Sequence, residues 1–182
     1  EHKLGLHASS TTPIILQEVK VPADAVLGEV GKGHKVAFNV LNFGRFKLGA
    51  MCSGGAKAGI AEAAKYAAAR KQFGVPIGSF QALQHRAAHL WCDIEVTASA
   101  VLNAGRQLDA DSDNAALAVS LAKARATATA QLSCLEGVQM HGGIGMTDAF
   151  DMGFYLKRAR VSAEWLGDYG YHAEQVARLR GF

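Results

Sequence analysis

The sequence has little of what marks membrane-spanning, nucleic-acid-binding or disulfide-rich proteins. No apolar run among its 182 residues is long enough to span a bilayer, so we expect no integral membrane segment. A net charge of +3, scattered along the chain, is too small to predict a nucleic-acid partner. The three cysteines, Cys52, Cys92 and Cys134, are far apart and lack metal-binding spacing, which predicts reduced, buried thiols and no metal site.

The composition that remains is that of a globular protein. Hydrophobic residues make up 49% of the chain and charged residues 19%, and the length suits one domain with its own core. The chain does not begin with Met, and we expect it to be a piece of a longer protein.

One strand is predicted near the N-terminus. Residues 14–21 are rich in β-branched side chains that partly alternate with polar ones, and Pro22 ends the pattern. A single strand is not stable alone, so we expect its partners to lie outside this sequence. A connector with several glycines follows, up to about residue 34.

Helical patterns occupy most of the remaining chain. Residues 35–70 predict a long helix with an alanine-rich second half. A loop over residues 71–79 follows, with Ser79 as the expected N-cap of a second helix. Apolar residues recur there at every third or fourth position: Phe80, Leu83, Ala87, Leu90, Ile94, Ala98 and Val101.

A third helix is predicted after a polar loop, with Ser112 or Asp113 as its cap. Two shorter helices are expected at residues 149–161 and 169–180. Short loops between long amphipathic helices favour an antiparallel bundle. The face of the third helix expected to be buried carries Leu117, Leu121, Ala124, Ala128, Leu132 and Leu135.

Two short segments are candidates for ligand binding. The stretch 139–146 places three glycines between helices, which ends the helix and lets backbone approach a ligand, although such a stretch can also be a simple turn. Arg70 ends the first long helix. Its cation either complements the helix dipole or binds phosphate through its planar guanidinium.

The order and spacing of several motifs resemble the C-terminal helical domain of the acyl-CoA dehydrogenases, over almost the whole chain. The motifs are residues 21–22, 27–28, 42–45, 70–74 with Gln81, and 139–143. The resemblance implies an all-α fold: an antiparallel four-helix bundle with a short N-terminal β segment. Residues 1–31 would be the tail of a middle β-domain and a connector, and residues 32–182 the bundle.

The resemblance also implies a function. Such proteins use FAD to dehydrogenate acyl-CoA thioesters between the α and β carbons, pass electrons to an electron-transfer flavoprotein, and form homotetramers built as dimers of dimers. A role in fatty acid metabolism, in the bacterial cytoplasm or the mitochondrial matrix, would follow. We expect the isolated piece to be inactive, because other domains complete the pocket.

Residue roles carry over position by position. Arg45 matches a substrate-binding arginine. Phe73 matches an aromatic at the cofactor interface, although a core aromatic is an equally good interpretation. The implied FAD-binding residues are Arg70, Phe73, Gln81, Gln139, Met140, His141, Gly142 and Gly143.

The chain departs from the family at the catalytic base. The position of the usual glutamate is Leu166, and the position used by a minority of members is Gly44. Glu164 and Asp168 are candidates if the loop shifts, and otherwise surface or capping residues. Three alternatives to an acyl-CoA dehydrogenase stay open: a non-catalytic flavin-binding subunit, a helical interaction module, and a flavin-dependent monooxygenase or oxidase on the same fold.

Overall fold

A computed structural model describes residues 2–3 and 7–182 of the chain. The chain forms two compact units, residues 1–41 and 42–182. The long helix α1 (Gly33–Ala69) begins in the first unit and ends in the second. The predicted domain boundary between residues 31 and 32 stays a prediction. The two compact units show where the chain packs on itself, and they do not show which residues belong to a middle β-domain.

The first unit contains little regular structure before α1. A single 3-10 turn, η1 (Ala23–Ala25), lies in the connector. Residues 14–21, predicted as a strand with partners outside this sequence, form no ladder within the described chain, and Ile14, Ile15 and Leu16 are all at least three-quarters exposed. A strand needs a partner for its N–H and C=O groups, and no described residue of this unit provides one.

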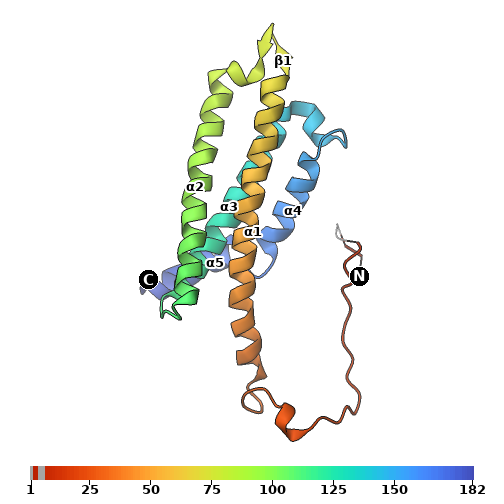
Figure 1. Cartoon of the computed structure of the whole chain (residues 1–182), viewed down its shortest axis with the longest axis vertical. Helices are drawn as coiled ribbons and strands as arrows, with labels where there is room; N and C mark the ends of the chain where they lie inside the picture. The colour runs from red at the N-terminus through yellow and green to blue at the C-terminus, as the bar shows by residue number, and fades with distance from the viewer. Residues whose placement is uncertain (1, 4–6) are drawn as a thin grey trace. The chain divides into compact units, whose positions relative to one another are not determined.

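The second unit is a helical bundle, as predicted. The later part of α1 lies beside α2 (Gln81–Asp109), α3 (Ala115–His141) and α4 (Met152–Glu164), and α5 (Tyr169–Arg180) packs against α3 (Figure 1). Two 3-10 turns, η2 (Ile77–Ser79) and η3 (Gly142–Met146), join helices. None of the helices among the described residues is both long and apolar enough to cross a bilayer.

Helix α3 is the centre of this bundle, and its buried surface is built from small side chains. Ala122, Ala126 and Ala130 are almost completely buried against α1 and α2. Small residues let helix axes approach closely, so backbone and side chains interlock. The Ser133 hydroxyl, for example, donates a hydrogen bond of 2.7 Å to the Ala56 carbonyl of α1.

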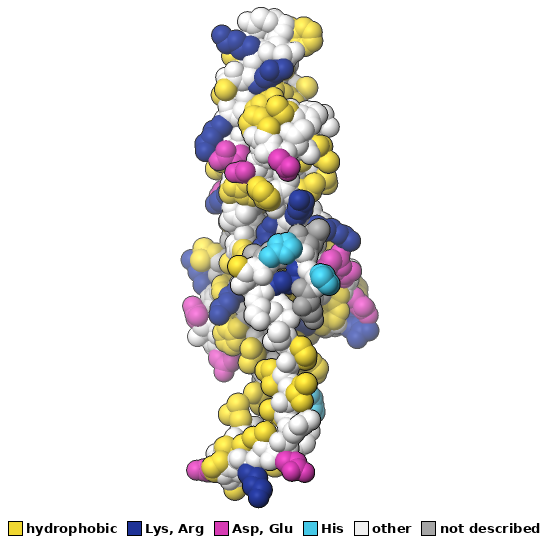
Figure 2. All heavy atoms as spheres, turned by 90° about the vertical axis from the view of Figure 1, so that its right-hand side faces the viewer, with side chains coloured by type: hydrophobic (Ala, Val, Ile, Leu, Met, Phe, Trp, Pro, Cys, Tyr) yellow, Lys and Arg dark blue, Asp and Glu magenta, His cyan; other side chains and the backbone are white. Residues whose placement is uncertain are grey.

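The face predicted to bury α3 is buried at Ala124 and half-buried at Leu117, but its other members are exposed. Leu121, Leu132 and Leu135 are 46%, 39% and 56% exposed. The prediction followed the largest apolar side chains, but alanine, serine and threonine fill the narrow space between these helices, which leaves the leucines on the outside. On the face shown in Figure 2, exposed apolar side chains are interspersed with basic and acidic ones.

Neither of the two helices with a predicted N-cap has it. Ser79 does not cap α2, because its hydroxyl donates to the Pro76 carbonyl instead. Neither Ser112 nor Asp113 caps α3, which begins after Asn114 without a side-chain cap. Residues 71–79, predicted as a loop, contain a small antiparallel hairpin of β1 (Lys71–Gln72) and β2 (Val75–Pro76).

The tight packing of α3 against α4 gives a testable prediction. A Cβ added at Gly137 would lie 2.2 Å from Cε of Met152, which is only 1% exposed. We expect Gly137→Ala to lower the free energy of unfolding by about 1–3 kcal/mol, because overpacking outweighs the better helix propensity of alanine.

Gly153 is the matched control, because no atom lies within 4 Å of its added Cβ. Gly153→Ala should be neutral or slightly stabilising in the same urea titration of the intact protein. Equal effects of the two substitutions would contradict the packing described here.

Candidate functional site

The predicted cofactor residues gather at one end of the bundle. Arg70 directly follows α1, the β1–β2 hairpin leads to Gln81 at the start of α2, and residues 139–143 end α3 at the same end (Figure 1). The hairpin is tied to Arg70 by a hydrogen bond of 2.8 Å from the Ile77 amide to the Arg70 carbonyl. Arg70 and Gln81 are both exposed.

Phe73 is displayed on the surface by an unusual turn. Phe73 and Gly74 both have positive φ, 53° and 83°, the pattern of a type I′ hairpin turn. Left-handed backbone costs a non-glycine residue about 1–2 kcal/mol. The Phe73 side chain is 92% exposed and touches only the edge of the Phe80 ring, at 6.1 Å between centroids. The core interpretation of Phe73 is therefore wrong.

A cavity of about 410 Å³ joins two of the predicted segments. Arg70 and His141, which are 71 positions apart in the sequence, both border it. The imidazole of His141 stacks on the Tyr66 ring at 4.3 Å, and its Nδ1–H donates a hydrogen bond of 2.7 Å to the Gly137 carbonyl. The lining residues are Glu62, Lys65, Tyr66, Ala69, Arg70, His141 and Phe150.

The glycine turn at the end of α3 offers open backbone. Gly142 has a φ of +69°, and neither Gly142 nor Gly143 has any atom within 4 Å of an added Cβ. Gln139 is exposed, whereas the Met140 side chain is buried in the core. A ligand at this turn could therefore meet the backbone and the Gln139 side chain, but only the main chain of Met140.

Arg45, a residue of α1, lies at the other end of the bundle, against the loop between α4 and α5. Its Nε donates to the Leu166 carbonyl at 3.2 Å. Its terminal nitrogens donate to Asn42 Oδ1 at 3.0 Å and to the Tyr171 hydroxyl at 3.2 Å. The guanidinium, predicted to bind substrate, is thus already engaged by three groups of the chain itself.

The two positions that could carry a catalytic glutamate are neighbours in space. A Cβ built on Gly44 would lie 2.9 Å from Cδ1 of Leu166. Leu166 also has a φ of +63°, a conformation that leucine rarely adopts. At the place where the family would carry its catalytic glutamate, this chain has Gly44 and Leu166, and neither residue has a titratable side chain.

The two carboxylates near Leu166 have other partners. Glu164 forms an exposed ion pair of 2.9 Å with Arg160, one turn earlier on α4. Asp168 is the N-cap of α5, where its Oδ1 accepts a hydrogen bond of 2.7 Å from the Tyr171 amide. Each geometry matches the surface and capping interpretations offered for these residues.

Two buried residues beside this loop escaped the sequence analysis. Lys123 is completely buried, and burial lowers the pKa of its ammonium. His172 is also completely buried, its Nε2–H donates to the Leu166 carbonyl at 3.1 Å, and burial lowers its pKa to about 4. Lys123 shares a helical face with Ala126, Thr127 and Ala130, so treating small residues as core would have revealed it.

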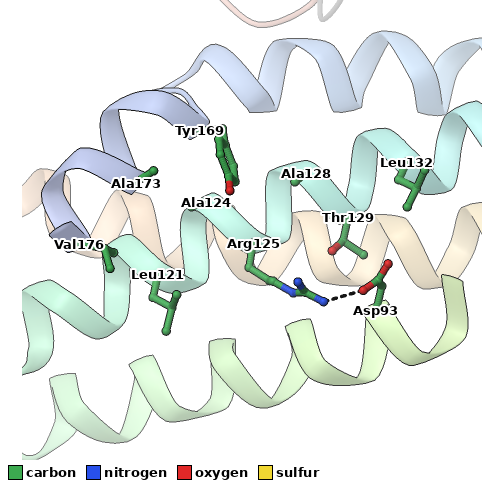
Figure 3. Close-up of a pocket in the computed structure, with 10 residues that line it drawn as sticks. All are labelled: Asp93, Leu121, Ala124, Arg125, Ala128, Thr129, Leu132, Tyr169, Ala173 and Val176. Atoms are coloured by element: carbon green, nitrogen blue, oxygen red, sulfur yellow. Dashed lines mark hydrogen bonds and ion pairs between the residues drawn. The ribbon is translucent and has the colours of Figure 1, made fainter. Parts of the chain in front are cut away.

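A second cavity, of about 440 Å³, lies between α2, α3 and α5 (Figure 3). The Arg125 guanidinium reaches across it from α3 to Asp93 on α2, at 2.6 Å. Leu121 and Leu132 line the same space, and Tyr169 borders it from α5. The sequence analysis singled out none of these residues as a ligand-binding site.

The cysteines match the prediction only in part. Cys52 and Cys134 are buried free thiols, and burial raises the pKa of both, that of Cys134 to about 11. Cys92 is exposed, contrary to expectation, because it lies on the outer face of α2. Within the described ranges, no group of three His, Cys, Asp or Glu side chains is arranged to hold a metal ion.

His172 generates a prediction about acid stability. Its pKa falls from an ordinary 6.5 to about 4 on folding, so the unfolded chain takes up the proton first as the pH falls. Its contribution to stability is complete above pH 6.5 and is lost as the pH falls toward 4. At pH 4.5 the resulting loss of unfolding free energy is about 2–3 kcal/mol.

His172→Gln removes the titration and keeps an N–H donor for the Leu166 carbonyl. Urea unfolding of the intact protein at pH 7 and pH 4.5 should show a smaller acid loss for this variant than for the wild type. Equal losses would mean that His172 is not the group responsible.

Comparisons with known proteins identify the family. The family described as "Acyl-CoA dehydrogenase, C-terminal domain" matches residues 31–179. The mitochondrial short/branched chain specific acyl-CoA dehydrogenase of Bos taurus is 34% identical over 178 residues, 98% of this chain and 41% of the relative. The CarC subunit of the caffeyl-CoA reductase–Etf complex of Acetobacterium woodii is 37% identical over 161 residues, 88% of this chain and 42% of the relative.

A solved structure shows the same fold. Butyryl-CoA dehydrogenase from Megasphaera elsdenii superposes with a TM-score of 0.85 at 29% identity, over 91% of this chain and 43% of that one. The chain thus spans about two-fifths of the length of these relatives. It belongs to the acyl-CoA dehydrogenase family and corresponds to that family's C-terminal helical domain.

Proposed function

We propose that the intact protein is an FAD-dependent acyl-CoA dehydrogenase and that this chain supplies part of its flavin site. The observation that carries the proposal is the cavity shared by Arg70 and His141, because it unites two cofactor segments that are remote in sequence. The name of the bovine relative supports an acyl-CoA substrate. The Etf complex of the Acetobacterium relative supports an electron-transfer flavoprotein as partner.

The residues at this end of the bundle fit the chemistry of FAD. An exposed guanidinium at Arg70 matches pyrophosphate oxygens in charge and geometry. The open backbone of Gly142 and Gly143 can approach the nucleotide, with Gln81 and Gln139 as exposed amide donors. The displayed ring of Phe73 offers a stacking surface. FAD, when bound, supplies the acceptor for the hydride from the β carbon.

We propose further that the cofactor is shared between subunits of a dimer of dimers. Arg70 follows Arg45 by 25 positions along α1. At 1.5 Å per residue, the two ends of the site are about 37 Å apart. A pocket assembled from both ends therefore draws on two chains. The exposed leucines on α3, Leu121, Leu132 and Leu135, provide apolar surface for such contacts.

At the other end, this chain orients the loop next to the expected substrate but offers no base. Glu164 and Asp168 are occupied as an ion pair and a helix cap, and Leu166 and Gly44 cannot accept a proton. We propose that the α-proton is taken by a group outside this chain.

The relatives include bacterial and mitochondrial proteins, which agrees with a place in the bacterial cytoplasm or the mitochondrial matrix.

The flavin role of Arg70 is tested by substitution in the intact protein. Arg70→Ala removes a charge-assisted bidentate contact, so FAD should bind about 10- to 100-fold more weakly. Lys71→Ala removes a neighbouring exposed cation from β1 and is the control. Flavin content and FAD titration by fluorescence measure the effect, and equal losses in both variants would contradict a specific role.

The reaction is tested by anaerobic titration with acyl-CoA thioesters of graded chain length. Bleaching of the flavin band with one class of thioester is the expected result. Bound flavin that never bleaches would favour a non-catalytic flavin-binding subunit. A protein that binds no flavin would leave the family fold without its cofactor chemistry.

The missing base generates a gain-of-function prediction. Leu166→Glu places a carboxylate where the family has one and should accelerate flavin bleaching by about 100-fold or more. Leu166→Gln has a similar size and no basic oxygen, so it should not accelerate bleaching. Equal rates for the two variants would show that position 166 does not face the substrate.

A further inference from the structure

The loop between α4 and α5 is held by other helices at its main-chain oxygens. Helix α4 ends at Glu164 and α5 begins at Tyr169, so the loop has four residues. Side chains from α1, α3 and α5 donate hydrogen bonds to carbonyls in the loop or in the last turn of α4. None of these bonds involves the side chain at position 166.

Lys123 makes the largest share of these contacts. Its Nζ lies 3.0 Å from the Ser162 carbonyl, 3.5 Å from that of Ala163 and 3.0 Å from that of Gly167. An ammonium has three N–H donors, and three carbonyl oxygens surround this one. Ser162 and Ala163 belong to the last turn of α4, where carbonyls lack helical partners and a cation is favourable.

The completely buried charge is the strongest sign that this arrangement is fixed. Removing an ammonium from water is costly unless hydrogen bonds replace the lost hydration. At Lys123 the carbonyls of the loop and of the end of α4 provide that replacement. Movement of the loop would therefore leave the buried ammonium without partners.

The other anchors hold Leu166 itself. Arg45 Nε, from α1, and His172 Nε2, from α5, both donate to the Leu166 carbonyl, at 3.2 and 3.1 Å. Gly167, the next residue, has a φ of +106°, and a Cβ there would lie 2.5 Å from Cδ1 of Tyr171. The loop backbone is thus fixed on both sides of the Leu166 side chain.

We propose that Lys123 is a positioning residue, whose ammonium fixes the α4–α5 loop from inside the bundle so that position 166 faces Gly44 whatever side chain it carries. The contacts of Lys123 do not depend on the proposed function. The inference rests on that function only where it says that the position of residue 166 matters for the reaction. It also explains why Glu164 and Asp168 do not reach the base position: the loop that would have to shift is anchored.

The loop anchor is tested by hydrogen–deuterium exchange of the intact protein. Lys123→Met keeps an unbranched side chain of similar length, removes all three donors and leaves no unpaired buried charge, because the partners of Lys123 are neutral carbonyls. Amides of residues 164–170 should exchange at least about 10-fold faster, while those of the β1–β2 hairpin stay unchanged. Lys57→Met, at a lysine of α1 whose side chain is 45% exposed, is the matched control.

A graded variant covers the case in which Lys123→Met fails to fold. Lys123→Gln keeps an amide donor on a shorter side chain and should give intermediate exchange in the same peptide. Exchange that is unchanged in 164–170, or that rises equally throughout the bundle, would overturn the proposal for either variant.

A second readout connects the anchor to the reaction. In a Leu166→Glu background, adding Lys123→Met should slow anaerobic flavin bleaching about 10- to 100-fold at saturating acyl-CoA, because the carboxylate is misplaced. The half-saturating acyl-CoA concentration and the flavin content should stay within about threefold. Unchanged bleaching in an active Leu166→Glu protein would overturn the positioning role.

The two readouts also separate the two hypotheses. Faster loop exchange in a protein whose flavin never bleaches with acyl-CoA, with or without Leu166→Glu, would overturn the proposed reaction and leave the anchor supported. Activation by Leu166→Glu without any change of loop exchange in Lys123→Met would support the reaction and overturn the anchor.

Discussion

Close approach of helices through small side chains is the constraint on which the rest of this structure depends. Alanines of α3 meet α1 and α2 with almost no exposed surface, and hydroxyls such as Ser133 bond directly to a neighbouring backbone. Such contact leaves little room for large side chains between α3 and these two helices, and Leu121, Leu132 and Leu135 lie outside. The same geometry brings the end of α4 within reach of Lys123.

The bundle separates two kinds of chemistry by its length. One end carries a cavity bordered by cationic and aromatic side chains, where we propose that the flavin binds. The other end carries the α4–α5 loop, whose backbone carbonyls accept hydrogen bonds from the buried side chains of Lys123 and His172. No free carboxylate of this loop lies at the position expected for the catalytic base. The two groups of residues lie about 37 Å apart on the same helices. A substitution at one end therefore makes no direct contact with the residues at the other.

Much of this was predictable from the sequence. Helical periodicity and alanine content located the helices, and the second of the two short ones matches its predicted range of 169–180. The segment around Arg70 and the glycine turn, which the resemblance assigns to one cofactor, both border one cavity through Arg70 and His141. The strand predicted at residues 14–21 is not formed, because a strand needs a partner for its backbone hydrogen bonds and the described part of this chain provides none.

Other features were missed. Lys123 shares a helical face with small buried residues, which is a signal in the sequence, but the carbonyls that hold its ammonium lie about 40 positions later in the chain. The caps at Ser79 and Ser112 failed because other local hydrogen bonds engage those hydroxyls. The hairpin turn requires positive φ at a phenylalanine, which residue preferences argue against.

That hairpin has a thermodynamic consequence for recognition. The unfavourable backbone of Phe73 is adopted when the chain folds, so the ring is already held away from the bundle before any partner arrives. Binding then need not order the turn, and the entropy normally lost in fixing a contact residue is absent from the binding equilibrium. The chain accepts a less stable free state in exchange for a pre-organised aromatic surface.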